Sequence, residues 1–166
     1  MDSVLNASIS LPSGEVLYEI STPPGKKSPT TIRKQGIEIG VVELRGACNV
    51  NGKEYVPVRG GGMFKSGTTL TFSNGSQYTW KHDSSKRKSH LIPLSPPEGA
   101  SIATYHHPPI MSRELVGNLA VTTSDTQLTD EIFATSVYVE QRRRFSVPKM
   151  IADSISRAVS AAGMVG

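Results

Sequence analysis

Residues 128–144 read LTDEIFATSVYVEQRRR, and this stretch decides the fold. It opens like a helix, places apolar side chains on nearly every side of that helix, and ends in three cations. A helix that is apolar around its circumference needs burial on all sides. Because the preceding chain reads as strands and turns, the sequence predicts a sheet wrapped around a central helix at about 128–143. The helix side chains expected to lie inside this wall are Ile132, Phe133, Val137 and Val139.

The composition favours one mainly β domain. The chain has 166 residues, enough for a sizeable core, and its 15 glycines and 11 prolines break it into short elements. Its single cysteine, Cys48, excludes an internal disulfide and fits a reducing compartment. The N-terminus lacks the features of a secretory signal, and no apolar run is long enough to span a membrane. We therefore expect a cytoplasmic protein.

Apolar and polar residues that alternate between turn residues predict the strands. In residues 37–45 the alternation changes register near Val42, and a bulge near Gly40 would explain the change. Residues 54–58 fit an edge or a bulge, because Pro57 has no N–H to donate. The predicted strands are 15–21, 30–34, 37–45, 54–58, 68–73, 76–82, 90–94, 100–107 and 115–122.

The dipeptide Asn74-Gly75, between two β-rich runs, predicts a hairpin with a type I′ turn. Residues two apart on a strand share a face, so each strand of this hairpin carries one apolar pair. Trp80 could serve as a stacking platform for bases or sugars. Core packing is the favoured interpretation, because a chain so poor in aromatic residues needs them inside. The side chains expected to point inward together are Leu70, Phe72, Tyr78 and Trp80.

The ends of the central helix carry the expected signals. Thr129 is a plausible N-cap, and Asp130 and Glu131 follow where the helix dipole favours anions. The three cations lie at the other end, where the dipole favours positive charge. Two polar residues, Thr135 and Ser136, fall within the buried stretch. Their hydroxyls are expected to bond backward to helix carbonyls or to the surrounding wall.

A second, amphipathic helix is predicted at 148–162. Pro148 fits its first turn, and apolar residues recur at helical spacing behind it. The sequence thus divides into a β domain with its central helix at 1–146 and a helix with a tail at 147–166. The terminal helix could pack on the β domain, on a second subunit or on a membrane.

The order of these features resembles a family of small fungal domains of unknown function, most abundant in mushroom-forming fungi. The resemblance covers about residues 4–144 and rests on LNASISLPSGEVLYEISTP, IEIGVVELR, SNGSQYTWKH, IATYHH and LTDEIFATSVYVEQRRR. That family is similar to the tubby C-terminal-like superfamily, whose domains are closed β-barrels threaded by one hydrophobic helix. The resemblance implies a closed barrel here. The amphipathic helix after the basic residues departs from the family pattern.

The residues that could carry chemistry do not form a recognisable catalytic or metal-binding motif. His106 and His107 are adjacent on a predicted strand and point to opposite faces, and His82 and His90 flank a basic loop. Their spacing matches no zinc motif. Cys48 lies in no nucleophile motif and is expected to be a buried or half-buried thiol. We predict neither an enzyme nor a metal or cofactor site.

The formal net charge of +4 is clustered, and clustered cations can attract phosphate groups. The first hypothesis is a binding module for anionic phospholipid headgroups of the phosphoinositide type, which are ligands of tubby-like relatives, or for a protein partner. The alternative is a structural protein that forms homo-oligomers through its terminal helix. Nucleic acid binding is not supported, because exposed aromatic residues do not alternate with the cations. The candidate anion-binding residues are Lys81, Lys86, Arg87, Lys88, Arg142, Arg143 and Arg144.

Overall fold

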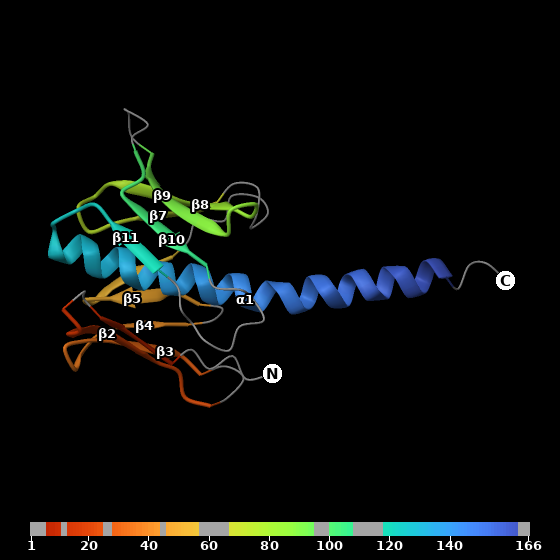
Figure 1. Ribbon diagram of the computed structural model, residues 1–166, viewed down its shortest axis with the longest axis horizontal. Helices are drawn as coiled ribbons and strands as arrows, with labels where there is room; N and C mark the ends of the chain where they lie inside the picture. The colour runs from red at the N-terminus through yellow and green to blue at the C-terminus, as the bar shows by residue number, and fades with distance from the viewer. Residues whose placement is uncertain are drawn as a thin grey trace.

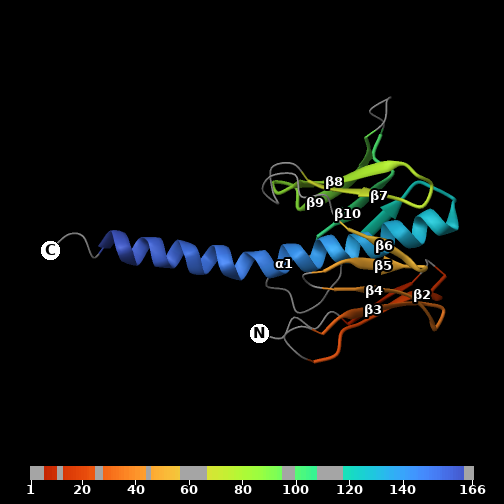
Figure 2. The same cartoon turned by 180° about the vertical axis from the view of Figure 1, so that it is seen from behind.

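A computed structural model describes residues 6–10, 13–24, 28–43, 46–56, 67–94, 100–107 and 118–162, with helix side chains as far as Arg144. Within these residues, two antiparallel sheets lie on opposite sides of one long helix, as Figures 1 and 2 show. The first sheet has the order β1 (Ala7–Ser10), β2 (Val16–Ser21), β3 (Thr30–Lys34), β4 (Ile37–Val42), β5 (Cys48–Val50) and β6 (Lys53–Tyr55). The second has the order β11 (Asn118–Val121), β10 (Ala103–His106), β9 (Lys88–Pro93), β8 (Gln77–Asp83) and β7 (Thr68–Thr71). The helix is α1 (Thr126–Ala162).

The first sheet is a meander in which each strand pairs with the next strand along the chain. The predicted bulge near Gly40 is confirmed, because Ile32 pairs with Gly40 while Arg33 pairs with Glu38. Gly40 is also required by close packing, since a Cβ there would come within 2.5 Å of the carbonyl oxygen of Asn49. Sequence patterns missed β1 and β5, which are short and carry little apolar alternation.

The hairpin between β7 and β8 forms as predicted, but its turn type was predicted wrongly. The N–H of Phe72 donates to the carbonyl of Ser76, and the N–H of Gly75 donates to the carbonyl of Phe72, both at 2.9 Å. Gly75 has a φ of 77°, whereas Asn74 keeps a negative φ. This is a three-residue loop with a glycine bulge, while a type I′ turn needs positive φ at both central residues. A type I′ pair does occur at Asn51-Gly52, with φ of 49° and 79°.

The helix is buried on all sides where it passes between the sheets, and each side is held by a different sheet. Every residue from 130 to 138 is buried. The ring of Tyr18 on β2 stacks on Phe133, with centroids 4.2 Å apart. Trp80 on β8 donates its Nε1–H to the hydroxyl of Thr135 at 3.1 Å. Phe133 and Thr135 are two residues apart and therefore point in nearly opposite directions from the axis. One helix thus supplies the core of both sheets.

Most residues predicted for the core lie there. Thr135 and Ser136 donate their hydroxyls to the carbonyls of Ile132 and Phe133, as expected for polar residues in a buried helix. Val139 differs from the prediction, since it is half-buried at the margin of the core. The predicted inward residues that are buried are Leu70, Phe72, Tyr78, Trp80, Ile132, Phe133 and Val137.

The expected closed barrel is replaced by two separate sheets. In the part of the chain that the structure describes, no hydrogen-bonded ladder joins β6 to β7 or β1 to β11. The strand β6 is three residues long, and the sequence places Pro57, which cannot donate to a ladder, two residues after it. The architecture is therefore mainly β, with two antiparallel sheets and one C-terminal helix.

The ends of the helix also differ from the prediction. The N-cap is Asp125, not Thr129, because an Asp125 carboxylate oxygen accepts the N–H of Leu128 at 3.1 Å. The helix continues through Pro148 to Ala162 as a single element, so no second helix begins there. The predicted placement of the cations at the helix C-terminus is therefore wrong. The amphipathic pattern expected for 148–162 concerns side chains outside the described ones.

Two acidic residues near the start of the helix bind groups of the two sheets, although they were expected only to interact with the helix dipole. Asp130 accepts a hydrogen bond from the Tyr18 hydroxyl at 2.5 Å and an ion pair from Lys34 at 2.7 Å. Glu131 accepts the backbone N–H of Ser73, in the β7–β8 hairpin, at 2.9 Å. Each acid thus ties the helix to one sheet.

Replacing Thr135 by Val should destabilise the fold through the Trp80 indole. The substitution removes the acceptor of a fully buried N–H, which costs about 1–3 kcal/mol. We expect the free energy of unfolding in urea to fall by that amount. Thr135→Ser keeps the hydroxyl and is the matched control. Equal stabilities of the Val and Ser variants would contradict the role of the hydrogen bond.

Candidate anion-binding site

A buried ion cluster lies where the helix leaves the sheets, and Glu140 is its centre. The carboxylate accepts hydrogen bonds from His107 Nδ1 at 2.6 Å, from Arg143 Nη2 at 2.7 Å and Nε at 2.9 Å, and from Arg144 Nε at 2.6 Å. Glu140 is 3% exposed. A carboxylate buried to this degree requires such partners, because an unpaired charge away from water is costly.

Helical spacing and one backbone hydrogen bond bring these groups together. Arg143 and Arg144 lie three and four residues after Glu140, so all three share one side of α1. His107 follows β10, and its N–H donates to the carbonyl of Arg87 at 2.8 Å. Arg87 belongs to the turn between β8 and β9. That turn and the arginines of α1 therefore lie at the same end of the molecule.

The charge state of Glu140 follows from these contacts. Burial alone would raise its pKa, but hydrogen bonds from His107 and Arg143, the charge of Arg143 and a hydrogen bond from Arg144 outweigh burial. The pKa of Glu140 falls to about 2. The cluster therefore contains a permanent carboxylate at neutral pH. The three consecutive arginines carry three positive charges, and Glu140 carries one negative charge.

Beyond His107 the contacts continue as a chain of polar groups. An ionised carboxylate can only accept, so His107 Nδ1–H is the donor to Glu140. The other ring nitrogen, Nε2, lies 2.6 Å from the Ser89 hydroxyl. Nδ1 of His82 lies 3.3 Å from the same hydroxyl. The chain links Glu140 to His82, which is half-buried.

The order Ser89, His107 and Glu140 has the connectivity of a nucleophile, base and acid relay. Access argues against this interpretation, because Ser89, the second residue of β9, is 1% exposed and its hydroxyl faces the buried His107 ring. A serine nucleophile must meet a substrate carbonyl next to preorganised oxyanion donors. The arrangement fits a buried hydrogen-bonded network that fixes the helix exit.

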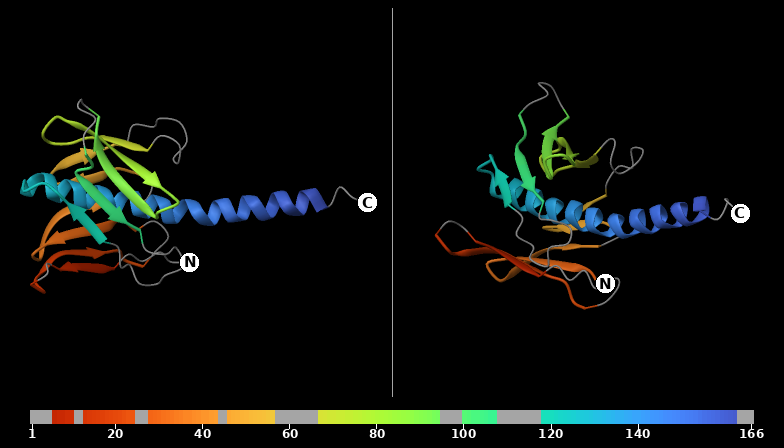
Figure 3. Two further views of the ribbon diagram at one scale, coloured as in Figure 1. Left: turned by 45° about the horizontal axis from the view of Figure 1, so that its top comes forward. Right: turned by 45° about the vertical axis from the view of Figure 1, so that its right-hand side comes forward.

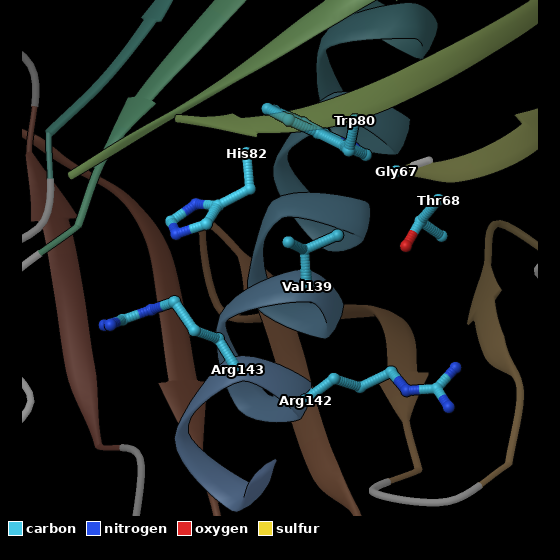
Figure 4. Close-up of a pocket in the computed structure, with 7 residues that line it drawn as sticks. All are labelled: Gly67, Thr68, Trp80, His82, Val139, Arg142 and Arg143. Carbon is cyan, nitrogen blue, oxygen red and sulfur yellow. The ribbon is translucent and has the colours of Figure 1, made fainter. Parts of the chain in front are cut away.

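A small open pocket lies beside the cluster, between β8 and α1. Figure 4 shows Trp80 and His82 descending from β8, with Arg142 and Arg143 extending from the helix on either side of Val139. Gly67 and Thr68 complete the lining. The pocket holds about 40 Å³ of space for water-sized groups. It thus combines an apolar floor with positive charge.

The same charges affect the pKa of His82. Burial lowers the pKa of His82, and the nearby His107 and Arg143 lower it further, against the opposing effects of Glu140 and Asp83. Its ring meets that of His107 edge to face, with centroids 4.9 Å apart. His82 is therefore a poor cation by itself, and an anion placed beside it would favour its protonation.

The structure brings some of the seven predicted cations together and separates others. Arg142 and Arg143 line the pocket, while Arg144 is turned onto Glu140. Lys81 is exposed on β8 and points to the opposite face of the sheet from His82, its neighbour in the chain.

The remaining predicted cations lie in the β8–β9 turn and at the start of β9. Lys86 lies 3.9 Å from the carboxylate of Asp83 and is largely exposed. Arg87 adjoins it in the turn, and its carbonyl accepts the His107 N–H. Lys88 is half-buried and pairs with Asp83 and His106 across the sheet. These cations therefore surround the helix exit without lining the pocket.

Sequence reasoning missed the residues that organise this site. Glu140 was not singled out, although its spacing to Arg143 and Arg144 is a recognisable ion-pair signal. His107 and Ser89 carry no local signal, because their partners are 33 and 18 residues away. His82 was considered for a metal site alone.

Other expectations about chemistry can be compared with the described residues. No group of three or more His, Cys, Asp or Glu residues suited to a metal ion occurs among them. Cys48 is buried as predicted, and burial raises the pKa of its thiol to about 12. No helix in the described part of the chain has the length and apolar character needed to cross a bilayer.

A model of a family of unknown function, DUF6593, matches residues 2–145. The chain belongs to this family. A search of curated proteins and of solved structures finds no match. The DUF6593 region includes both sheets, the buried part of α1 and the ion cluster, whereas the remainder of the helix lies after it.

Stability should decrease at acid pH because of Glu140. Its pKa is about 2 in the folded state against 4.5 for an unperturbed glutamate, so its contribution is complete above pH 4.5. The contribution is lost as pH falls from about 4.5 to 2, by roughly 3 kcal/mol in total. Unfolding in urea across this pH range measures the loss.

Glu140→Gln should remove this part of the pH dependence and lower the stability at pH 7 by about 3–5 kcal/mol, as expected when one partner of a buried ion pair is removed. Glu19→Gln, at an exposed position of β2, is the matched control and should leave both properties unchanged. An unchanged acid transition in Glu140→Gln would contradict the central role of the cluster.

Proposed function

We propose that this DUF6593 protein is a non-enzymatic binding module that docks on anionic membrane surfaces of the phosphoinositide type. One observation carries the proposal. The cations of the β8–β9 turn and the arginines of α1 gather at the end of the sheets from which the helix projects. The hydrogen bond from His107 to Arg87 and the ion pair from His107 to Glu140 hold these two groups of cations together.

The charges at this end support electrostatic docking of moderate strength. A lysine or arginine close to an anionic leaflet contributes about 1 kcal/mol. The Lys86 side chain is largely exposed, so it is available to such a leaflet. Arg143 and Arg144 share Glu140, which reduces their attraction to a distant surface. Charge alone would therefore give reversible, salt-sensitive binding.

The projecting part of the helix would supply apolar contact. Figure 3 shows α1 extending well beyond both sheets. From residue 145 to residue 162 it has a length of about 27 Å at the usual helical rise. The sequence of this part places apolar residues at helical spacing, which is typical of helices that lie in a membrane interface. These apolar residues are Val147, Met150, Ile151, Ile155, Ala158, Val159 and Ala162.

The tubby-like resemblance remains a proposal. One hydrophobic helix covered by strands agrees with that resemblance, whereas the two separate sheets do not reproduce its closed barrel. The fungal origin and the cytoplasmic location are likewise predictions made from sequence.

Removing the turn cations should weaken vesicle binding. We expect Lys86→Gln/Lys88→Gln to bind vesicles of phosphatidylcholine with 5% phosphatidylinositol phosphate about ten-fold more weakly than the parent protein, by co-sedimentation in 100 mM salt. Two fewer charges near an anionic surface correspond to roughly 2 kcal/mol at most. Arg33→Gln/Lys53→Gln, on the first sheet, makes the same change in net charge. Equal weakening by both pairs would contradict docking through this end.

Self-association through the helix is a second candidate function. The observation in its favour is that the projecting part of α1 has no other described element beside it (Figures 1 and 3). A short helix without packing partners is marginally stable in water, so a second copy could cover its apolar side.

A lysine on the apolar side of the projecting helix would distinguish self-association. We expect Ile155→Lys to convert an oligomer into a monomer, because a charge cannot be buried between two helices without a partner. Ser156→Lys introduces the same charge at a position that belongs to the polar side in the sequence pattern, and it should leave the oligomeric state unchanged. Multi-angle light scattering of the full chain measures both. A monomeric parent protein would remove this candidate.

A further inference from the structure

The β8–β9 turn carries two serines among its cations, and their hydroxyls differ. Ser84 and Ser85 precede Lys86 and Arg87, and all four residues are exposed. The Ser85 hydroxyl donates to Asp83 Oδ1 at 2.6 Å. The Ser84 hydroxyl makes no hydrogen bond to any residue that the structure describes. A group added to Ser84 would therefore break no contact of the folded turn.

Cations flank Ser84 on both sides along the chain. Lys81 lies three residues before it, and Lys86 and Arg87 lie two and three residues after it. Asp83 is the opposing charge, but its carboxylate already accepts two backbone N–H groups of the turn, at 3.1 and 3.2 Å. Carboxylates of a partner enzyme pair well with lysine and arginine, and charge patterns of this kind select the substrates of protein kinases.

The turn can open without disturbing the sheet. An enzyme that modifies a chain needs the segment to extend into its active site, and exposed loop tips meet this need. Residues 84–86 bury no side chain, so extending them costs the three hydrogen bonds that Asp83 accepts. The ladder between β8 and β9 begins beyond them, where Asp83 pairs with Lys88. A segment with so few buried contacts opens at low cost in free energy.

Ser146 also follows cations, but its segment is helical. Three arginines precede it closely in the sequence, and its backbone lies within α1. Extending that segment would break helix hydrogen bonds and separate Glu140 from Arg143 and Arg144. The β8–β9 turn is therefore the better acceptor segment in the folded chain.

We infer that Ser84 is a phosphorylation site for a serine kinase that recognises basic segments. The Ser84 Oγ attacks the γ-phosphorus of ATP, and the bond from that phosphorus to the bridging oxygen of ADP breaks. The hydroxyl proton passes to the catalytic carboxylate of the kinase, and ADP leaves. The product is a phosphate monoester on the exposed turn.

A phosphate on Ser84 would cancel the charge of the turn. Three cations, Lys86, Arg87 and Lys88, and one carboxylate, Asp83, give the turn a net charge of +2 at neutral pH. A phosphoserine carries about −1.5 to −2 at pH 7. Basic segments are released from anionic membranes by phosphorylation in this way. This consequence rests on the proposed function, whereas the assignment of Ser84 does not.

Phosphorylation of the folded chain tests the assignment. The full chain is incubated with magnesium ATP and the catalytic domain of protein kinase C, a kinase that selects serines flanked by cations. We expect fragment-ion mass spectrometry to place phosphate on Ser84, and to find none in the turn after Ser84→Ala. Ser85→Ala keeps the Ser84 hydroxyl and should be modified at least as fast as the parent protein. Phosphate confined to other serines of the parent protein overturns the assignment.

The flanking cations give a second test of the same assignment. Lys81→Gln/Lys86→Gln removes one cation on each side of Ser84, and kcat/KM for its phosphorylation should fall at least ten-fold. Arg33→Gln/Lys53→Gln makes the same change in net charge on the first sheet and should leave kcat/KM within two-fold. Equal rates for the two pairs would show that the kinase does not recognise this turn, against the inference.

Vesicle binding tests the consequence separately. Phosphoserine placed at position 84 by an expanded genetic code changes the charge about as much as Lys86→Gln/Lys88→Gln. We therefore expect about ten-fold weaker co-sedimentation with the same phosphatidylinositol phosphate vesicles. Phosphoserine in place of Ser10, which is exposed on β1, is the matched control and should bind within two-fold of the parent protein.

The two proposals fail in different ways. A parent protein that does not bind these vesicles contradicts membrane docking, and phosphate found on Ser84 still upholds the modification site. A parent protein that binds equally well with and without phosphoserine at position 84 overturns the regulation of docking through this turn.

Discussion

The removal of one helix from water on every side is the constraint on which the rest of the structure depends. Residues 130–138 are all buried, and their partners come from two sheets that do not pair with each other in the described chain. Phe133 contacts Tyr18 of one sheet, and Thr135 contacts Trp80 of the other. Neither sheet has a core without the helix, so we expect helix and sheets to fold together.

Burial on all sides forces the polar residues of the helix to find partners within the protein. Near the start of the helix, Asp130 and Glu131 bind groups of the two sheets. Where the helix leaves the sheets, Glu140 binds His107 and two arginines. The fold therefore concentrates ion pairs at both ends of the buried segment. The cluster at the exit also orients Arg143, one of the two arginines that line the pocket, so a stabilising network and a candidate binding site share this side chain.

The exit of the helix is the part of the molecule where structure and proposed function meet. The family region ends at residue 145, one residue after Arg144, and the helix continues to Ala162. Its projecting part leaves the sheets next to the pocket and the β8–β9 turn. A membrane surface approached by this end would meet the turn cations and the projecting helix together. A second copy would meet mainly the helix.

Local patterns in the sequence by themselves determined most of the strands, the hairpin at Asn74-Gly75, the inward side of Tyr78 and Trp80, and the buried helix. Alternation, turn residues and all-round apolarity are properties of neighbouring residues, so they can be read along the chain. The closed barrel was predicted wrongly because strand pairing across a seam depends on contacts between distant segments. Only the tertiary structure decided that Glu140 meets His107, that Arg143 turns toward a pocket and that Lys81 faces away from it. These partners are far apart in sequence, and a buried charge selects whichever partners the folded backbone brings within reach.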